Sequence, residues 1–284
     1  MVILLGLAAA VLYGSGDFLG GMATRRAHVL TVLTVADIAA VITAMAAAAM
    51  FPGQAGLAGL AWGISAGLIG GLGLIVFYIG LATGPMSVVA PVSGLVSTVL
   101  PVGVALAEGE RPGVGVYAGA LLCLVAVVLA SSAGPTSAAD GSGRPGRGRA
   151  IAYGVISGAS FGLFFLLIRN AGQSGTFWPV AAGRIGELAT VLIAAAVLRR
   201  GLLPRGTGGR PLLAAAGAGV IDVVANICYV AATRTGMFGL AVVLASLYPG
   251  VTVLLARVVL GERLRWVQRA GLVLAAIGIL LVAA

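Results

Sequence analysis

Long apolar stretches follow one another along almost the whole chain, separated by short segments rich in Gly, Pro and Arg. No charged residue lies between Asp37 and Glu108. That stretch has room for about three membrane helices, because each span needs about 20 apolar residues. Short segments that contain Gly, Pro or Arg divide the chain into ten predicted helices. They are expected at residues 2–21, 29–51, 56–81, 87–107, 112–130, 150–168, 177–198, 211–232, 238–256 and 264–284.

Composition excludes a soluble globular protein. The 284 residues are 60% hydrophobic and only 9% charged, with a mean hydropathy of +1.14. Soluble domains carry about 25% charged residues, which they need to cover their surface. The sequence therefore predicts an all-α, polytopic protein of the cell membrane, with the lipid bilayer as its main partner.

The net charge of +9 does not indicate nucleic-acid binding. All 17 basic residues are arginines, and they lie between apolar spans without interleaved aromatic residues. Cys123 and Cys228 lie inside apolar spans, and His28 is the only histidine. Neither a disulfide framework, a metal site nor any cofactor is expected from this set.

The two halves of the sequence resemble each other. A shift of 152 residues aligns Thr83-Gly84 with Thr235-Gly236, and it aligns Gly109-Glu110-Arg111 with Gly261-Glu262-Arg263. In so apolar a chain, Leu and Ala of the two halves would align by chance at many shifts. The Thr-Gly and Gly-Glu-Arg groups would not align by chance at one and the same shift. The sequence therefore predicts an internal repeat.

The predicted repeats are residues 1–132 and 150–284, joined by a flexible Gly-, Ser-, Pro- and Arg-rich linker at residues 133–149. Five helices is an odd number, so the second repeat should cross the membrane in the opposite orientation. Inverted five-helix repeats are typical of transporters, whose substrate site lies near the midplane where the halves meet.

The spacing of glycines predicts helix packing, whereas the positions of prolines predict a candidate site. Gly59, Gly63, Gly67 and Gly71 recur every four residues and predict close helix packing. Prolines interrupt the fourth and ninth predicted helices among hydroxyl side chains, which favours either a binding site or a kink repaired by local Ser and Thr. The candidate residues there are Ser93, Ser97, Ser246 and Tyr248.

Charged side chains at membrane depth are costly and normally face a cavity or a partner. Arg184 and Glu187 are three residues apart and can pair, whereas Asp17 is expected to lie shallow. Asp37 and Asp222 have no opposite charge within one turn, so they are the better candidates to bind and release a proton. Arg184 is expected either to hold Glu187 ionised or to anchor an anionic substrate group. The candidate polar residues are Asp37, Arg184, Glu187, Asp222 and Asn226, for which a structural interhelical pair remains the alternative.

The chain resembles the EamA-like transporters of the drug/metabolite transporter superfamily. The resemblance rests on Tyr248-Pro249 followed by Gly261-Glu262-Arg263-Leu264, and on the aromatic-Gly pairs Tyr13-Gly14 and Phe161-Gly162. Arg184 matches an arginine often found in the second helix of the family repeat. The first half departs from the pattern, since Ser97 replaces the proline. The resemblance implies a transporter of small metabolites without naming a substrate or a direction.

The leading interpretation is a secondary transporter, an exporter of small polar metabolites that works by alternating access and is coupled to protons. The absence of lysine excludes a Walker-type loop and hence ATP-driven transport by this chain. The alternatives are a channel or a membrane scaffold without a transport cycle. An intramembrane enzyme is a weaker alternative, because only Ser15 and His28 could form a nucleophile–base pair; no catalytic residue is expected.

The distribution of arginines predicts the orientation in the membrane. Thirteen lie in or beside the loops of one predicted side, three lie on the other, and Arg184 lies within a span. The positive-inside rule then places both termini outside the cell, whereas the resemblance implies cytoplasmic termini. Following the charge count, we expect a reporter that is active only in the cytoplasm to be inactive when fused after Ala284. An active fusion would contradict this orientation.

Overall fold

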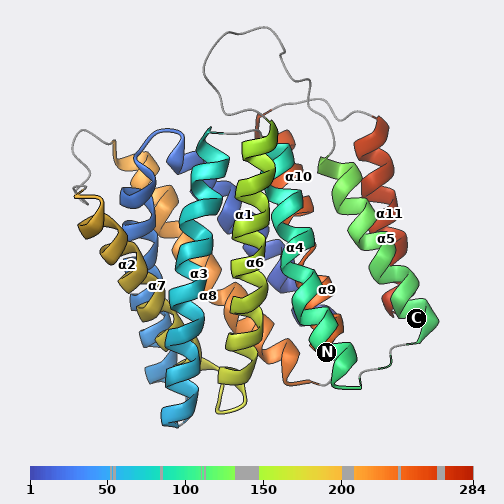
Figure 1. The fold of residues 1–284 in the computed structure, drawn as a ribbon, viewed down its shortest axis with the longest axis horizontal. Coiled ribbons are helices and arrows are strands. Elements are labelled where there is room, and N and C mark those ends of the chain that lie inside the picture. Colours follow the sequence, from blue (N-terminus) through green and yellow to red (C-terminus); the bar gives the residue numbers. More distant parts are fainter. Residues whose placement is uncertain are drawn as a thin grey trace, which may run out of the picture.

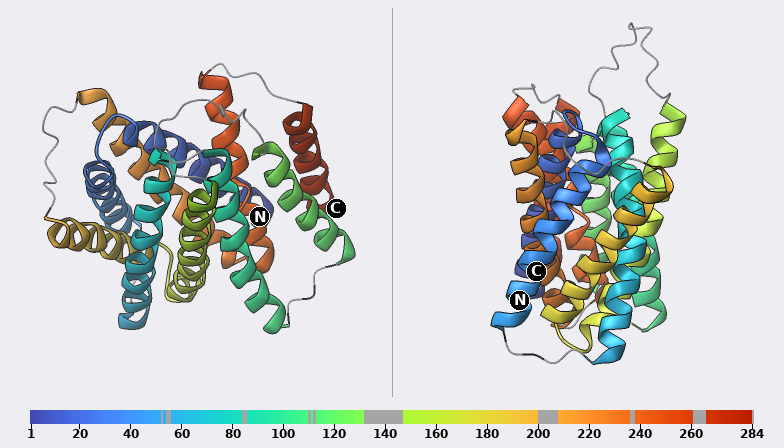
Figure 2. Two further views of the ribbon diagram at one scale, coloured as in Figure 1. Left: turned by 45° about the horizontal axis from the view of Figure 1, so that its top comes forward. Right: turned by 90° about the vertical axis from the view of Figure 1, so that its left-hand side faces the viewer.

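The computed structural model describes residues 1–51, 53, 56–83, 86–109, 111, 113–131, 147–199, 208–235, 238–260 and 266–283. These residues form helices and no strand (Figure 1). Figure 1 shows both chain ends in the lower half of the bundle, and Figure 2 shows the same bundle from two further directions. The helices are α1 Val2–Thr24, α2 Val29–Met50, α3 Leu57–Thr83, α4 Met86–Ala107, α5 Val114–Ser131, α6 Arg147–Gly172, α7 Phe177–Val197, α8 Gly209–Thr233, α9 Phe238–Ala245, α10 Tyr248–Leu260 and α11 Trp266–Ala283.

Seven of the described helices contain a stretch long and apolar enough to cross a membrane. These stretches are Val2–Thr24, Val29–Met50, Leu57–Thr83, Val88–Ala107, Gly148–Gly172, Phe177–Val197 and Gly209–Thr233. Large apolar side chains such as Leu4, Ile42 and Leu213 are exposed on the outside of the bundle. Such a surface is suited to lipid rather than to water.

The predicted ninth helix is broken in two. Pro249 has no N–H to donate to the carbonyl of Ala245, so the helical ladder ends there and resumes at Tyr248. Across the break, the Leu247 N–H donates to the carbonyl of Leu244 at 3.2 Å in a tighter turn. The structure therefore has two helices, α9 and α10, where the sequence predicts a single ninth helix.

The predicted interruption of the fourth helix is wrong, because α4 runs without a break from Met86 to Ala107. Pro101 leaves the carbonyl of Ser97 without its helical N–H donor. Gly162 of α6 lies against this carbonyl, at 3.1 Å from the position of a Cβ atom built on the glycine. The backbone of α6 thus packs closely on α4 beside the freed carbonyl.

The predicted turns and linker lie only partly within the described residues. Gly109 has φ +91°, so it ends the segment after α4 in the left-handed conformation expected of a glycine there. Glu110, Gly261 and Glu262 lie outside the described residues, as do residues 133–146 of the predicted linker. Arg147–Arg149, assigned to the linker from sequence, instead belong to α6.

Helices of the first half pack mainly on helices of the second half. The α3–α7 and α3–α6 contacts have counterparts in α2–α8 and α1–α8, and the α4–α6 contact has counterparts in α1–α9 and α1–α10. The helices α5 and α11 pack on each other at one edge of the bundle (Figure 1). The core of the molecule is therefore an interface between the two halves.

The predicted glycine face of α3 packs against α7. A Cβ atom built on Gly63 would lie 2.5 Å from the carbonyl oxygen of Pro179, and one built on Gly67 would overlap the carbonyl of Gly183. A similar contact joins α8 to α2, where a Cβ atom on Gly219 would overlap the Ala36 carbonyl. Close backbone packing therefore holds these helix pairs together, as the glycine spacing predicts.

A Gly67→Ala substitution should destabilise the protein, because the added methyl group meets backbone atoms that cannot rotate away. We expect a loss of about 1–3 kcal/mol, typical of overpacking, seen as a lower apparent melting temperature in detergent. Gly103→Ala on α4 is the matched control, since nothing lies within 4 Å of its added Cβ. Equal melting temperatures for the two variants would contradict this packing.

Candidate functional site

A cavity of about 80 Å³ lies midway along the bundle. Seven helices line it, namely α1, α2 and α3 from the first half and α6, α7, α8 and α10 from the second. Its polar and charged lining residues are Tyr13, Asp17, Asp37, Tyr78, Arg184, Glu187, Asp222, Asn226 and Tyr248. Water occupies about 10–15 Å³ by this measure, so the space admits several waters or a small ligand.

Arg184 is held between two carboxylates. Its Nη1 lies 2.5 Å from Oε2 of Glu187, one turn further along α7, and it also donates to Oδ2 of Asp222 on α8. Arg184 and Glu187 are almost fully buried, whereas the Asp222 side chain is 31% exposed. Asn226 adds to this cluster, because its Nδ2 donates to the Asp222 carbonyl at 2.9 Å and to Oδ2 at 3.2 Å.

The pairing of Asp222 corrects the sequence interpretation. Asp222 has no opposite charge within one turn of its own helix, but the tertiary fold supplies Arg184 from α7. Arg184 is therefore already engaged by two carboxylates, and its role as a free anchor for an anionic substrate is not supported by this arrangement.

Asp37 and Asp17 line the same cavity without an ion pair among the described residues. Asp37 is only 2% exposed, and its Oδ2 has no hydrogen-bond partner. Asp17 was expected to lie shallow because Arg25 and Arg26 follow soon after. That expectation is wrong, since α1 continues for about two further turns and carries Asp17 into the bundle.

The predicted serines are buried at helix contacts and are not among the described residues that line the cavity. Thr98 Oγ1 donates to Ser246 Oγ at 2.7 Å, and Ser246 Oγ donates to the carbonyl of Val242 at 2.7 Å. Ser157 Oγ lies 3.2 Å from Ser93 Oγ, which joins α6 to α4.

Ser97 Oγ donates to the carbonyl of Gly94 at 3.0 Å, so it too bonds to its own helix. Ser97 and Ser246 therefore bond to the carbonyls of Gly94 and Val242, which no proline frees. Tyr248 differs from the serines, because it follows the break between α9 and α10 and lines the cavity. None of the described lining residues comes from α4, α5 or α11.

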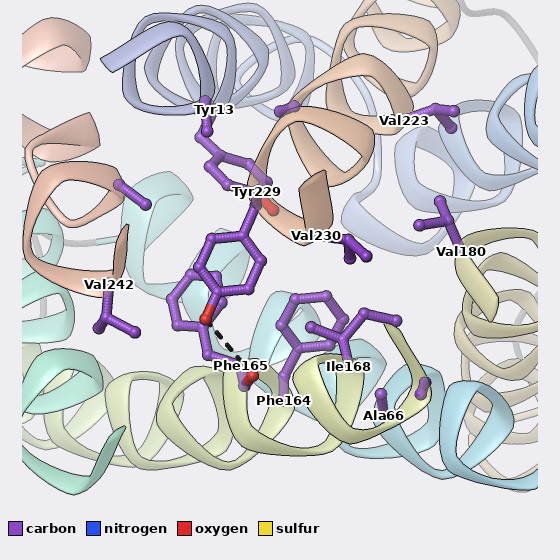
Figure 3. Close-up of a cluster of buried hydrophobic side chains, with 14 of the residues drawn as sticks. Tyr13, Ala66, Phe164, Phe165, Ile168, Val180, Val223, Tyr229, Val230 and Val242 are labelled. Carbon is purple, nitrogen blue, oxygen red and sulfur yellow. Dashed lines mark hydrogen bonds between the residues drawn. The ribbon is translucent and has the colours of Figure 1, made fainter. Parts of the chain in front are cut away.

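Aromatic rings form one wall of the cavity. The rings of Tyr13 and Phe165 have centroids 6.2 Å apart, and those of Tyr13 and Tyr248 are 6.3 Å apart, both edge to face. Tyr229 packs behind them, and its hydroxyl donates to the Phe165 carbonyl at 3.4 Å (Figure 3). Phe161 also lines the cavity, so both aromatic-Gly pairs of the sequence contribute an aromatic ring.

The aromatic lining residues that sequence reasoning did not select are Tyr78, Phe164 and Phe165. The hydroxyl of Tyr78 sits against Gly20 of α1, a contact between residues far apart in the chain. The spacing of Gly154, Gly158 and Gly162 was an available signal that this part of α6 packs closely on α4, but nothing in the sequence shows which way the phenylalanines face.

An ion pair joins α4 to α6 at one end of the bundle. Arg169 Nη2 lies 2.6 Å from Glu108 Oε2, and the Arg169 guanidinium stacks over the ring of Phe238 at 4.1 Å. The hydrogen bond from Arg169 holds the pKa of Glu108 below its usual value. Glu108 is half exposed, so this pair contributes little to stability, and that contribution disappears as the pH falls and the carboxylate is protonated.

Within the described part of the chain, no group of three or more His, Cys, Asp and Glu side chains is placed to hold a metal ion. The site thus consists of carboxylates, one neutralised guanidinium, one amide and aromatic rings. Such a set can bind a polar molecule or a proton by charge and hydrogen bonding.

Residues 148–284 match the family profile of the EamA-like transporters. The second half of the chain is therefore similar to this family, which is part of the drug/metabolite transporter superfamily. A solved structure described only as "Crystal structure of protein" has a TM-score of 0.76 and covers 99% of this chain and 95% of its own. At 18% identity it shows that the fold is shared. No curated protein sequence matches.

These findings establish the broad class of the protein. The matched family is a transporter family, and the chain is a multi-pass protein of the cell membrane. The EamA-like half contains Arg184, Glu187, Asp222 and Asn226, so the charged cluster belongs to the matched region.

Replacing Arg184 by Gln should destabilise the protein by about 3–5 kcal/mol, because two carboxylates then lose their buried partner. Adding Glu187→Gln and Asp222→Asn to this variant removes the orphaned charges and should recover much of the loss. Apparent melting temperature and gel-filtration profile in detergent measure both effects. Arg234→Gln on the exposed end of α8 is the control; a similar loss there, or no recovery in the triple variant, would contradict the role of the cluster.

Proposed function

We propose that this chain is a secondary transporter that exports small polar metabolites across the cell membrane by alternating access. The observation that supports it is the cavity midway along the bundle, which is lined by helices of both halves and contains buried charges. Charged groups at membrane depth are expensive and are retained where they contact a substrate, an ion or each other.

The proposed transport cycle depends on two inverted repeats, at residues 1–132 and 150–284. The contacts support this, since α3–α7 corresponds to α2–α8 when the halves are exchanged, and α4–α6 corresponds to the contacts of α1 with α9 and α10. Rocking of one half against the other would expose the same cavity to each side in turn.

The proposed coupling ion is the proton, and Asp37 is its proposed carrier. Asp37 is buried, faces the cavity and has no ion-pair partner among the described residues, whereas Asp222 and Glu187 are both held by Arg184. A carboxylate that exchanges a proton needs access to the pathway and freedom from a permanent partner. Asp37 meets both conditions.

The alternatives fit the geometry less well. Ser15 Oγ donates to the carbonyl of Val11, and Nδ1 of His28 accepts from the Leu30 N–H as a helix cap, so the two do not form a nucleophile–base pair. A channel commonly selects ions with rings of like residues. The charged residues of this cavity instead come from four different helices of one chain and do not form such a ring. A scaffold without transport would not require unpartnered buried groups.

Substrate-dependent counterflow in proteoliposomes tests the proposal across a panel of small polar metabolites. A transporter exchanges internal for external substrate, whereas a scaffold does not, and a channel shows no accumulation by exchange. Inside-out vesicles test the direction, because an exporter accumulates substrate in them. Failure of every metabolite to exchange would overturn the proposed function.

Replacing Asp37 by Asn should abolish uptake driven by a pH gradient and leave the fold intact. Stability should change by less than about 1 kcal/mol, because no partner of Asp37 is lost. Asp222→Asn is the contrasting variant, since it removes one of the two charges that balance Arg184 and should lower the melting temperature. Full pH-driven transport by a folded Asp37→Asn protein would refute the coupling role.

A further inference from the structure

The cavity has an excess of acidic groups. Its lining includes four carboxylates, from Asp17, Asp37, Glu187 and Asp222, and one guanidinium from Arg184. Arg184 bonds to two of the four, so one positive charge is shared between two negative ones. Asp17 and Asp37 lie outside this pairing. A cation that enters this space can replace a proton in balancing the unpaired carboxylates, because isolated buried charges are strongly disfavoured.

The buried lining atoms without a hydrogen-bond partner include one donor, Arg184 Nε, beside acceptor oxygens of a carboxylate and an amide. Asp37 Oδ2 and Asn226 Oδ1 are buried without a partner. The orientation of the Asn226 amide follows from its neighbour, since its Nδ2 donates to an Asp222 carboxylate that can only accept. The hydroxyl of Tyr13 is also buried without a partner among the described residues, lines the same space and can accept a hydrogen bond. A ligand that donates N–H hydrogen bonds would satisfy these oxygen atoms.

The apolar part of the lining is aromatic. Tyr13, Phe161, Phe164, Phe165 and Tyr248 all face the cavity. A ring face attracts a cation through its quadrupole, most strongly where water is excluded. The same rings restrict the size of a ligand, because the cavity holds only about 80 Å³.

We propose that the cavity binds a small organic cation that carries N–H donors, of the alkylammonium class, with Asp17 and Asp37 holding its charge and the aromatic wall covering its apolar part. This substrate class rests on the proposed function, in which the cavity is the transport site. A quaternary ammonium ion satisfies the charge but leaves the acceptors unpaired, and an anion meets excess negative charge. The site should therefore rank ligands by both charge and donor capacity.

Isothermal titration of the purified full-length protein at pH 7 tests this ranking with three small probes. Propylammonium should bind, tetramethylammonium should bind at least about tenfold more weakly for want of donors, and propionate should show no binding. Equal binding of the two cations would overturn the donor requirement. Binding of propionate as tightly as propylammonium would overturn the whole assignment.

Single substitutions locate the site. Asp37→Asn and Asp17→Asn should each weaken propylammonium binding at least about tenfold, measured on protein that elutes as a single gel-filtration peak. Glu108→Gln is the matched control, since Glu108 is a carboxylate outside the cavity and should leave the affinity unchanged. Unchanged affinity in both aspartate variants would overturn the proposed site. Should either variant fail to fold, the three-probe series on the natural protein still decides the ligand class.

Counterflow separates this inference from the proposed function. Propylammonium that binds but does not exchange across proteoliposomes would overturn the transport function and leave the cation site standing. Exchange of neutral or anionic metabolites without any binding of propylammonium would overturn the cation site alone. Binding together with exchange supports both.

Discussion

The bundle depends on how a buried arginine is neutralised. An unpaired guanidinium at this depth would be among the most costly groups that a membrane helix can carry. Glu187 supplies one carboxylate from the same helix, and Asp222 supplies the second from α8. The pairing therefore removes the charge penalty and ties α7 to α8 at the level of the cavity. The remaining polar groups of the cavity are arranged around this fixed point.

Close glycine packing positions the charged cluster. On α3, the backbone at Gly67 lies directly against Gly183 and the N–H of Glu187, the segment of α7 that carries the ion pair. On α8, Gly219 packs against Ala36, which brings the adjoining Asp37 toward the helix of Asp222. Side chains at these contacts would push the helices apart and separate the charges. The small-residue faces thus contribute to the site as well as to stability.

Much of the architecture follows from one-dimensional patterns. The apolar stretches predicted a helical membrane protein, and the spacing of Gly63 and Gly67 predicted that the third helix packs closely on a neighbour, because both depend on local composition and helical period. The sequence also identified a pair three residues apart, Arg184 with Glu187, since neighbours on one helix are fixed by its geometry. The sequence did not show that one helix ends at Ala245 and another begins at Tyr248. It also did not show that α4 continues without a break through Pro101.

The residue types and their helical spacing are properties of the sequence by itself, and they determined the membrane class and most of the polar candidates. Only the tertiary structure decided which candidates meet. It gave Asp222 a partner on α7, brought Asp17 into the cavity and placed Ser93 and Ser246 in contacts between helices. The physical reason is that helical periodicity fixes neighbours within a helix, whereas the rotation and depth of one helix against another depend on the packing of all of them together.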